Sequence, residues 1–223
     1  MKKLLLILFV VLAVSIHAKE KQKYINVNGS AEVEVIADQM NINVNIKTIK
    51  NSIEESKKTN DIAVDNLINI LNDFGIEKQS VEISPVSLGK NYEYKQGERV
   101  QNGYFTNVSV SILLKDLSKY YELIDKVSLN DEFEITNSNY SVSEYETHVK
   151  NAYEKALTAA KEKAAFMAKT LGVDLGEVLE IDENNSYGNP MPLNAMAKED
   201  YQAGDIAGKV TINRNVRVKF GIM

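Results

Sequence analysis

The amino-acid sequence predicts an α+β fold in which antiparallel β-sheets are covered by helices on one face. Long segments with strict alternation of apolar and polar residues predict half-buried strands, and segments with apolar residues at helical spacing predict amphipathic helices. The predicted strands follow one another closely, which favours antiparallel pairing. The order of elements also suggests two related halves, each with a strand, a helix and two further strands.

Two alternating segments come first in the predicted domain. Residues 25–35 separate Ile, Val, Ala and Gly from Asn, Ser and Glu, and residues 40–46 separate Met, Ile and Val from Asn. Only the short turn Ala37-Asp38 lies between them. We therefore expect these two strands to pair as a hairpin.

Two helices carry start and stop signals. Ser52 and Glu55 form a capping box at the start of the first helix, which should end at Gly75. A second capping box, Ser143–Glu146, precedes the longest helix, which should end at Gly172. The many alanines of this helix allow it to lie close against a sheet.

The segment between the two helices predicts further strands. One begins at Val81 and passes Pro85, which should lie at an edge or a bulge because proline has no N–H to donate. A hairpin loop is predicted over residues 97–103, followed by an alternating strand over residues 104–114. The remaining predicted elements are a short helix over 117–124 and strands over 133–142, 177–181 and 210–220.

The N-terminal residues 1–18 have the features of a secretory signal peptide. Lys2-Lys3 precede the apolar run Leu4–Val14, and Ala18 is the predicted cleavage site. The run is about half the length of roughly 20 residues that a spanning helix needs. We therefore expect export of a soluble mature domain, residues 19–223, with no integral membrane segment.

Composition excludes several classes of protein. Loss of the two N-terminal lysines with the signal takes the formal net charge from -5 to -7. An acidic chain opposes non-specific binding of nucleic acid, so no nucleic-acid partner is expected. The sequence has no Cys, which excludes disulfides.

Residues 184–208 lack any period and exceed the usual loop length of about 12–15 residues, so they predict a functional loop or a disordered segment.

No residue pattern indicates catalysis, a cofactor or a metal. Once the signal is removed, His148 is the single histidine, and it lies four residues after Glu144, which is typical of a helix-surface pair. The glycine patterns of phosphate-binding loops are absent. Acidic residues are plentiful, so a hydrolase that uses two carboxylates is the alternative from another class, together with a protein that binds a small ligand.

One concentration of aromatic residues is a candidate partner or ligand surface. Tyr92, Tyr94, Tyr104 and Phe105 flank the loop predicted over residues 97–103. The alternative is that these are ordinary strand residues, because strands favour Tyr and Phe.

Four segments, in their order and spacing, resemble the SIMPL domain family, which includes periplasmic immunogenic proteins of Gram-negative bacteria. They are Ile25–Val33 with Ala37-Asp38, then Leu71–Ile76 leading to Val81–Pro85 and Tyr92–Tyr94, then Gly103-Tyr104, and last the helix Ala152–Gly172. The resemblance implies an α+β fold, export to the periplasm or outer envelope, self-association and a loose link to stress tolerance. The family has no agreed enzymatic activity, so the resemblance supplies no catalytic residues.

The sequence thus predicts a periplasmic envelope protein that is not an enzyme. We expect a homo-oligomer, or a complex with an envelope protein, with a role in envelope integrity or stress tolerance. The alternatives are the carboxylate-dependent envelope hydrolase and the small-ligand-binding periplasmic protein.

Overall fold

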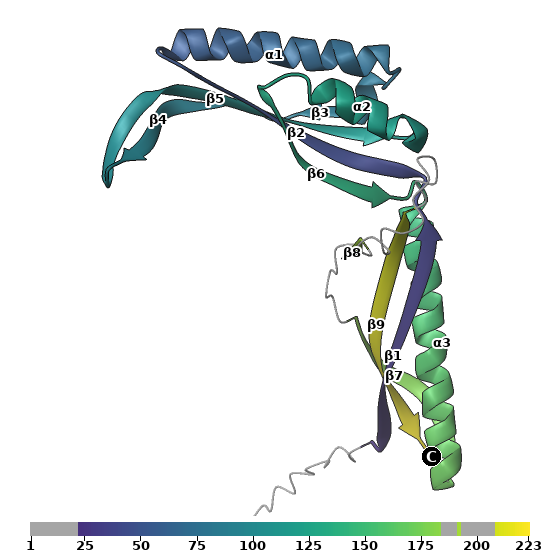
Figure 1. Cartoon of the computed structure of the whole chain (residues 1–223). Coiled ribbons are helices and arrows are strands. Elements are labelled where there is room, and N and C mark those ends of the chain that lie inside the picture. The colour runs from purple at the N-terminus through teal and green to yellow at the C-terminus, as the bar shows by residue number, and fades with distance from the viewer. Residues whose placement is uncertain (1–21, 184–190, 193–207) are drawn as a thin grey trace, which may run out of the picture.

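The protein is described here by a computed structural model covering residues 22–183, 191–192 and 208–223. The α+β class is confirmed: antiparallel strands form two sheets, and each sheet carries helices on one face (Figure 1). We call the two layered units module A and module B; they meet at a bend. The predicted signal peptide, residues 1–18, lies outside the described residues, as does most of the segment 184–208.

Module B contains the larger sheet. Its strand order is β3-β5-β2-β6, and β4 lies beside β3 on the same edge of β5. The single strand predicted to pass Pro85 is divided there into β3 and β4, and Pro85 lies at the edge of the sheet, as expected. The elements of module B are β2 (Gln39–Lys50), α1 (Ile53–Asp73), β3 (Val81–Ile83), β4 (Ser87–Lys95), β5 (Glu98–Leu114), α2 (Tyr120–Val127) and β6 (Phe133–Ser141), with 3-10 turns at Lys78–Ser80 and Leu117–Lys119.

Module A is narrower and contains the two ends of the described chain. Its strand order is β1-β9-β7, and the long helix α3 packs on β1 and β9. Within the segment predicted as irregular, a two-residue strand, β8, pairs with β9. The elements of module A are β1 (Tyr24–Ile36), α3 (Tyr145–Leu171), β7 (Leu175–Glu183), β8 (Met191–Pro192) and β9 (Lys209–Ile222).

The two modules share one connectivity. In module A the chain order is β1, α3, β7 and β9, and in module B it is β2, α1, β3 with β4, and then β5. In both sheets the last of these strands lies between the first and the third. The predicted strand-helix-strand-strand halves are therefore present, but module B is inserted between β1 and α3 rather than placed before or after module A.

The hairpin predicted from the first two strands is wrong. β1 pairs with β9 along its whole length, whereas β2 pairs with β5 and β6. The apolar face of β1 packs under α3 and that of β2 under α1, so the two strands belong to different cores. The residues Ala37-Asp38 carry the chain from one sheet to the other.

The hairpin that joins β4 to β5 is tighter than predicted. Its turn is Gln96-Gly97, both with positive φ (53° and 88°), which is the conformation of a type I′ turn. Gly103, the predicted end of the loop, lies inside β5 instead. There φ is 79°, and a Cβ would meet the carbonyl oxygen of Lys50 at 2.5 Å. The position therefore requires glycine because of its positive φ and its close contact with β2, and not because it lies in a loop.

Module A depends on a close approach of helix and sheet. The buried face of α3 is built from Ala152, Ala156, Ala160, Ala164 and Ala168, each 2 % exposed or less. On β1, a Cβ at Gly29 would lie 2.0 Å from the carbonyl oxygen of Ala156. The alanine-rich helix thus lies against the backbone of β1, as the sequence predicts.

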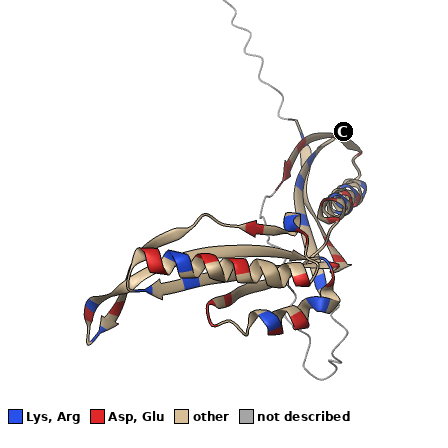
Figure 2. Ribbon diagram, turned by 90° about the horizontal axis from the view of Figure 1, so that it is seen from above, with Lys and Arg blue, Asp and Glu red and all other residues tan. Residues whose placement is uncertain are grey.

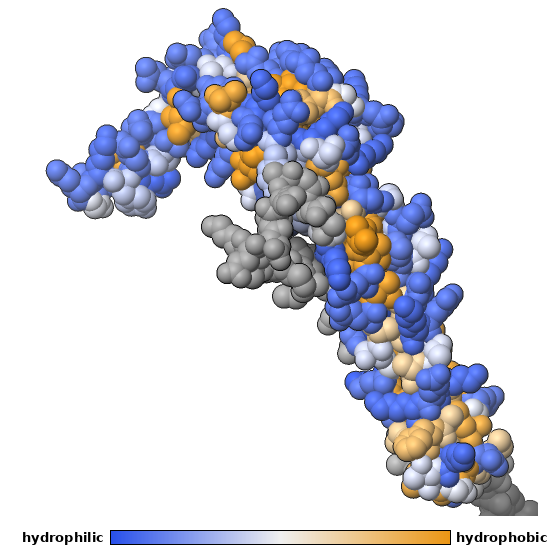
Figure 3. Space-filling model, turned by 45° about the vertical axis from the view of Figure 1, so that its right-hand side comes forward, coloured by the Kyte–Doolittle hydropathy of each residue, from blue (hydrophilic) through white to orange (hydrophobic). Residues whose placement is uncertain are grey.

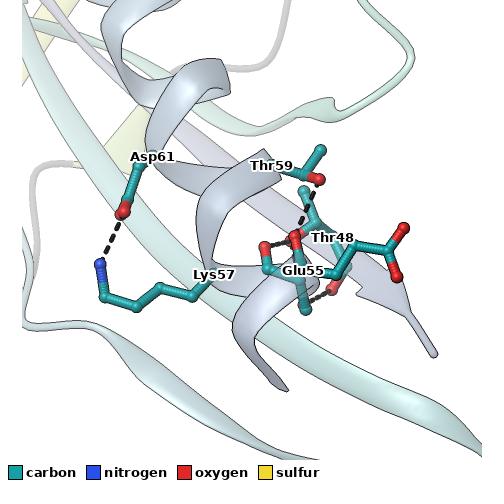
Figure 4. Close-up of polar contacts among 6 residues, drawn as sticks. Thr48, Glu55, Lys57, Thr59 and Asp61 are labelled. Carbon is teal, nitrogen blue, oxygen red and sulfur yellow. Dashed lines mark hydrogen bonds and ion pairs between the residues drawn. The ribbon is translucent and has the colours of Figure 1, made fainter. Parts of the chain in front are cut away.

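Module B is held by a larger apolar core and by a buried polar contact at the start of α1. The Ser52 hydroxyl accepts a hydrogen bond from the Glu55 N–H at 3.2 Å, which confirms the predicted cap. One turn later, the Thr48 hydroxyl donates to the Ser56 carbonyl at 2.7 Å, and the Ser56 hydroxyl donates to the Thr48 carbonyl at 3.0 Å (Figure 4). The Asn60 amide, fully buried, donates to the Ile46 carbonyl at 2.8 Å. These bonds fix α1 on the sheet.

Among the residues that the structure describes, no helix has both the length and the apolar character required to cross a membrane.

Candidate interaction surface

One face of the module B sheet is not covered by any described helix (Figure 1). Even-numbered residues of β2 and β5, such as Ile46 and Val110, are buried on the α1 side, so the odd-numbered residues point to the other face. These side chains are amides and hydroxyls. We call the surface the amide face; its members are Asn41, Asn43, Asn45, Asn107, Ser109, Ser111, Asn137 and Asn139.

The amide face is ordered by cross-strand hydrogen bonds. The Ser111 hydroxyl donates to the Asn43 amide oxygen at 2.7 Å, and the Ser109 hydroxyl donates to the Asn45 amide oxygen at 3.3 Å. Charged residues lie mainly on the helices and on the tip of the β4–β5 hairpin, and the middle of the strands carries few (Figure 2). The amides and hydroxyls of the face are uncharged and offer both donors and acceptors, whereas Glu82 beside Ser111, Glu134 beside Asn45 and Lys47 beside Asn107 add charges on the same face.

The predicted aromatic surface lies on the β4–β5 hairpin, but its members are divided between two faces. Phe105 is odd-numbered and shares the amide face, whereas Tyr104 points to the α1 side. The extra residue of the register shift between Lys90 and Tyr92 lies in β5, so the alternation of β4 continues and Tyr92 and Tyr94 share the face of Lys90 and Tyr104. Of the four predicted residues, Phe105 alone thus extends the amide face.

Two aromatic rings on the hairpin form cation–π contacts with basic side chains. The Arg99 guanidinium lies 3.8 Å from the centre of the Tyr92 ring, and the Lys47 ammonium lies 5.7 Å from the centre of the Phe105 ring. Tyr94 is 77 % exposed. Tyr94 is therefore the most accessible aromatic side chain of the predicted surface.

The junction between the modules contains a second group of polar residues. The prediction that Ser143 caps α3 is wrong. Its hydroxyl donates to one oxygen of the Asp38 carboxylate at 2.5 Å, and its N–H donates to the other at 2.9 Å. Glu144 occupies the cap position of α3, and its carboxylate accepts a hydrogen bond from the Thr147 hydroxyl at 3.1 Å rather than from a backbone N–H of the helix. Ser143 thus bonds to Asp38 and not to the N-terminal backbone of α3.

These contacts set the electrostatics of the junction. The pKa of Asp38 is lowered, chiefly by the hydrogen bond from the Ser143 hydroxyl and to a smaller extent by the positive charge of His148. His148 is half-buried rather than exposed, and its N–H bonds to the Glu144 carbonyl at 3.2 Å. The Ser143 hydroxyl is thus engaged by the Asp38 carboxylate in a contact that joins two chain segments.

The uncovered face of module A differs from the amide face because it carries charges of both signs. Lys209 pairs with Glu34 at 2.9 Å, and Lys219 pairs with Glu180 at 2.8 Å. The Lys219 ammonium lowers the pKa of Glu180, and the Glu34 carboxylate raises the pKa of Lys209. These pairs are exposed, so each contributes little to stability.

Two clefts bear on the alternatives left open by the sequence. The cleft between α1 and α2 holds the carboxylates of Asp73 and Glu122, but Lys119 and Lys126 line it as well and balance their charge. The Lys119 ammonium donates to a main-chain carbonyl, that of Phe74, at 2.9 Å. This cleft, with its two carboxylates, is the one that bears on the alternative of a hydrolase with paired carboxylates.

The other cleft, between α1 and β3, has mainly aliphatic walls. Its volume of about 310 Å³ lies at the lower end of the range for ligand pockets, about 300–1,000 Å³. Ile83 in its wall is 50 % exposed, so the cleft is open to solvent. In the described part of the chain, no three acidic or histidine side chains come together as metal ligands.

Comparison with known proteins points to one family. The sequence pattern of SIMPL, described as a protein of unknown function (DUF541), matches residues 25–220. The chain is 24% identical over 185 residues to the 26 kDa periplasmic immunogenic protein of Brucella melitensis, covering 75% of this chain and 72% of that one. It is 26% identical over 148 residues to the uncharacterized protein YggE of Escherichia coli, covering 65% of this chain and 59% of that one.

Proposed function

The chain belongs to the SIMPL family, and from this premise we propose that it is an exported protein of the cell envelope that acts by contact with other protein chains, copies of itself included. The proposal places it in the periplasm, because the Brucella relative is named as a periplasmic protein. It assigns no catalysis. A role in envelope integrity or stress tolerance is part of the proposal.

The observation that carries the proposal is the amide face. The predicted mature chain is acidic, and like charges on two copies would repel one another. The amide face lowers this obstacle because its Asn and Ser side chains carry no charge and the charged residues among them, Lys47, Glu82 and Glu134, are few and of both signs. They also donate and accept hydrogen bonds, so two such faces, or this face and a polar partner, can satisfy one another.

The aromatic residues of the hairpin add a second contact surface. Phe105 continues the amide face toward the hairpin tip, and Tyr92 and Tyr94 lie on the other face of the hairpin. Aromatic side chains contribute strongly to interfaces because they bury a large area with few rotatable bonds. We therefore propose Phe105 as a contact residue of the amide face, and Tyr94, with Tyr92 beside it, as a contact residue on the other face of the hairpin.

Light scattering on the mature protein, at near-physiological salt and over a range of concentrations, tests the proposal. We expect a mass greater than that of one subunit. The double variant Ser109→Glu/Ser111→Glu puts charge on the amide face of every copy and should lower this mass. The control Asn66→Glu/Asn69→Glu adds the same charge to exposed positions on α1 and should leave the mass unchanged.

Two results would count against the proposal in different ways. A mass of one subunit at tens of micromolar would overturn self-association. Equal masses for the amide-face variant and the α1 control would show that the chains meet elsewhere. Circular dichroism of both variants establishes that each retains its secondary structure.

A further inference from the structure

The shared connectivity of the two modules shows that the strand beside the first strand, β6 in module B, has no counterpart among the described residues of module A. β1 corresponds to β2, since each is the first strand of its module and lies beside the last. In module B the other edge of β2 pairs with β6. In module A, among the described residues, β1 pairs with β9 alone. β1 therefore presents a long edge without a neighbouring strand.

One hydrogen bond shows which backbone groups face this edge. The Lys163 ammonium approaches the Asn28 carbonyl at 3.4 Å, although that carbonyl lies on a strand whose other side is paired with β9. In an antiparallel strand, the N–H and C=O of one residue point to the same side. Asn28 and the other even-numbered residues of β1 thus direct their backbone groups to the free edge.

The sequence of β1 has few of the devices that protect an edge. Residues 24–36 contain no proline and no lysine, the residues that most often prevent edge pairing, and the Lys163 ammonium that approaches the Asn28 carbonyl from α3 would move aside on pairing. The ends of the strand also expose apolar side chains: Tyr24 is 51 % exposed and Ile36 is 68 % exposed. Hydrophobic residues also reach the surface at the free end of module A, where β1 begins (Figure 3).

We propose that β1 pairs antiparallel with β1 of a second copy, about a two-fold axis that passes through Ser30. This inference rests on the self-association proposed above and names a contact that is separate from the amide face. The occupant of the free edge is the same strand in another chain. The interface then adds the strand that module A lacks by comparison with module B.

The residues of β1 are self-complementary in this register. Ser30 is the central residue of the strand, so Tyr24 lies opposite Ile36 of the second copy and each exposed apolar side chain gains an apolar neighbour. The amides of Asn26 and Asn28 lie opposite Glu34 and Glu32. A register moved two residues toward the C-terminus would instead place Glu32 opposite Glu32, which like charges oppose.

The helix layer is compatible with this pairing. A two-fold axis perpendicular to the sheet keeps both copies of α3 on the same face. α3 lies over β1 and β9 and approaches β1 most closely at Gly29, so the two helices would lie side by side above the joined β1 strands. The dimer would therefore have a continuous sheet of two β1 strands flanked by β9 and β7, beneath a pair of helices.

Because the chain has no Cys, a single introduced cysteine reports the register directly. In the proposed dimer the two Ser30 Cα atoms lie about 5.5 Å apart, within disulfide range. We expect Ser30→Cys to form a covalent dimer under mild oxidation. Asn66→Cys, at an exposed position on α1, is the control and should remain a monomer on a non-reducing gel.

A proline variant tests the same contact without cross-linking. Asn28→Pro removes an N–H that faces the free edge, so the pairing of β1 with β9 is retained and pairing with a second copy is lost. Asn28→Ala keeps the N–H and is the matched control. We expect light scattering to show a lower mass for Asn28→Pro than for wild type, and a wild-type mass for Asn28→Ala.

The outcomes separate this inference from the proposed function. If the wild-type mass exceeds one subunit, but Ser30→Cys does not cross-link and Asn28→Pro associates as wild type does, the chain self-associates and β1 is not the interface. If the wild-type protein has the mass of one subunit, both proposals fail. If Asn28→Pro does not fold, which circular dichroism shows, the Ser30→Cys result alone decides.

Discussion

The Asp38 carboxylate accepts two hydrogen bonds from Ser143, which lies 105 residues later in the chain. Asp38 belongs to the link from β1 to β2, and Ser143 to the link from β6 to α3. These are the points where module B leaves and rejoins module A. The pair therefore fastens together the two chain crossings between the modules.

Removal of this contact should weaken the protein. We expect Asp38→Ala to lower the free energy of unfolding at neutral pH by about 1–2 kcal/mol, because two hydrogen bonds to a charged group are lost. Ser143→Ala should cost less, since its N–H still bonds to Asp38. Urea unfolding measures both, and Asp65→Ala, an exposed position on α1, should change stability by less than about 0.5 kcal/mol.

The same contact should make stability depend on pH in acid. The pKa of Asp38 is lowered in the folded protein, mainly by the Ser143 hydroxyl, so folding favours the ionised form. The contribution of Asp38 is then complete above the unfolded pKa of about 3.9 and is lost as the pH falls through the lower folded value. The urea midpoints of wild type and Asp38→Ala should converge in acid; a gap that stays constant with pH would contradict this.

Gly29→Ala should disrupt the packing of α3 on β1. The added Cβ would lie 2.0 Å from the Ala156 carbonyl oxygen and 2.8 Å from the Ala160 Cβ, so helix and strand must separate. Overpacking of this kind typically costs about 1–3 kcal/mol. Thermal unfolding tests the expectation against Ser30→Ala, the exposed neighbour on the other face, which should unfold close to the wild-type temperature.

Asn60→Asp should destabilise module B more than its small change in shape suggests. The buried Asn60 amide donates to the carbonyls of Ile46 at 2.8 Å and Thr106 at 3.3 Å. Aspartate replaces the donor with an oxygen that faces two other oxygens, and a buried unsatisfied charge costs about 3 kcal/mol or more. Asn66→Asp, on the exposed side of the same helix, is the control. Similar unfolding curves for the two variants would show that the buried amide is dispensable.

Sequence patterns predicted the elements of this fold better than their partners. Alternation and helical spacing are local, so β1, β2, α1 and α3 could be recognised from neighbouring residues. The partner of β1 is β9, almost the whole chain away, and no local pattern distinguishes it from β2. Ser143 failed as a predicted cap for the same reason, because its partner, Asp38, is distant in sequence.

The candidate surface was predicted in part. Tyr92, Tyr94 and Tyr104 lie on one face of the hairpin, because the register shift adds its extra residue to β5 and leaves the alternation of β4 intact. Phe105 is adjacent to Tyr104 in sequence and therefore points to the opposite face, which is the amide face. The sequence does predict polar strand faces that carry Asn and Ser more than charge, Asn41, Asn43 and Asn45 on one strand and Asn107, Ser109 and Ser111 on another, and hence weak repulsion between copies. It does not predict that they form one amide face, because the sequence does not specify which strands are neighbours.

The insertion of module B within module A has a consequence for the order in which the chain folds. All of the strands of module B lie between Gln39 and Ser141, so its contacts can form from that stretch alone. β1 precedes them in the chain, yet its partner β9 is the last strand. Contacts between distant segments form slowly because a long loop must close first. The first strand of the described chain therefore waits for the last one, and module A closes around a module B that is already folded.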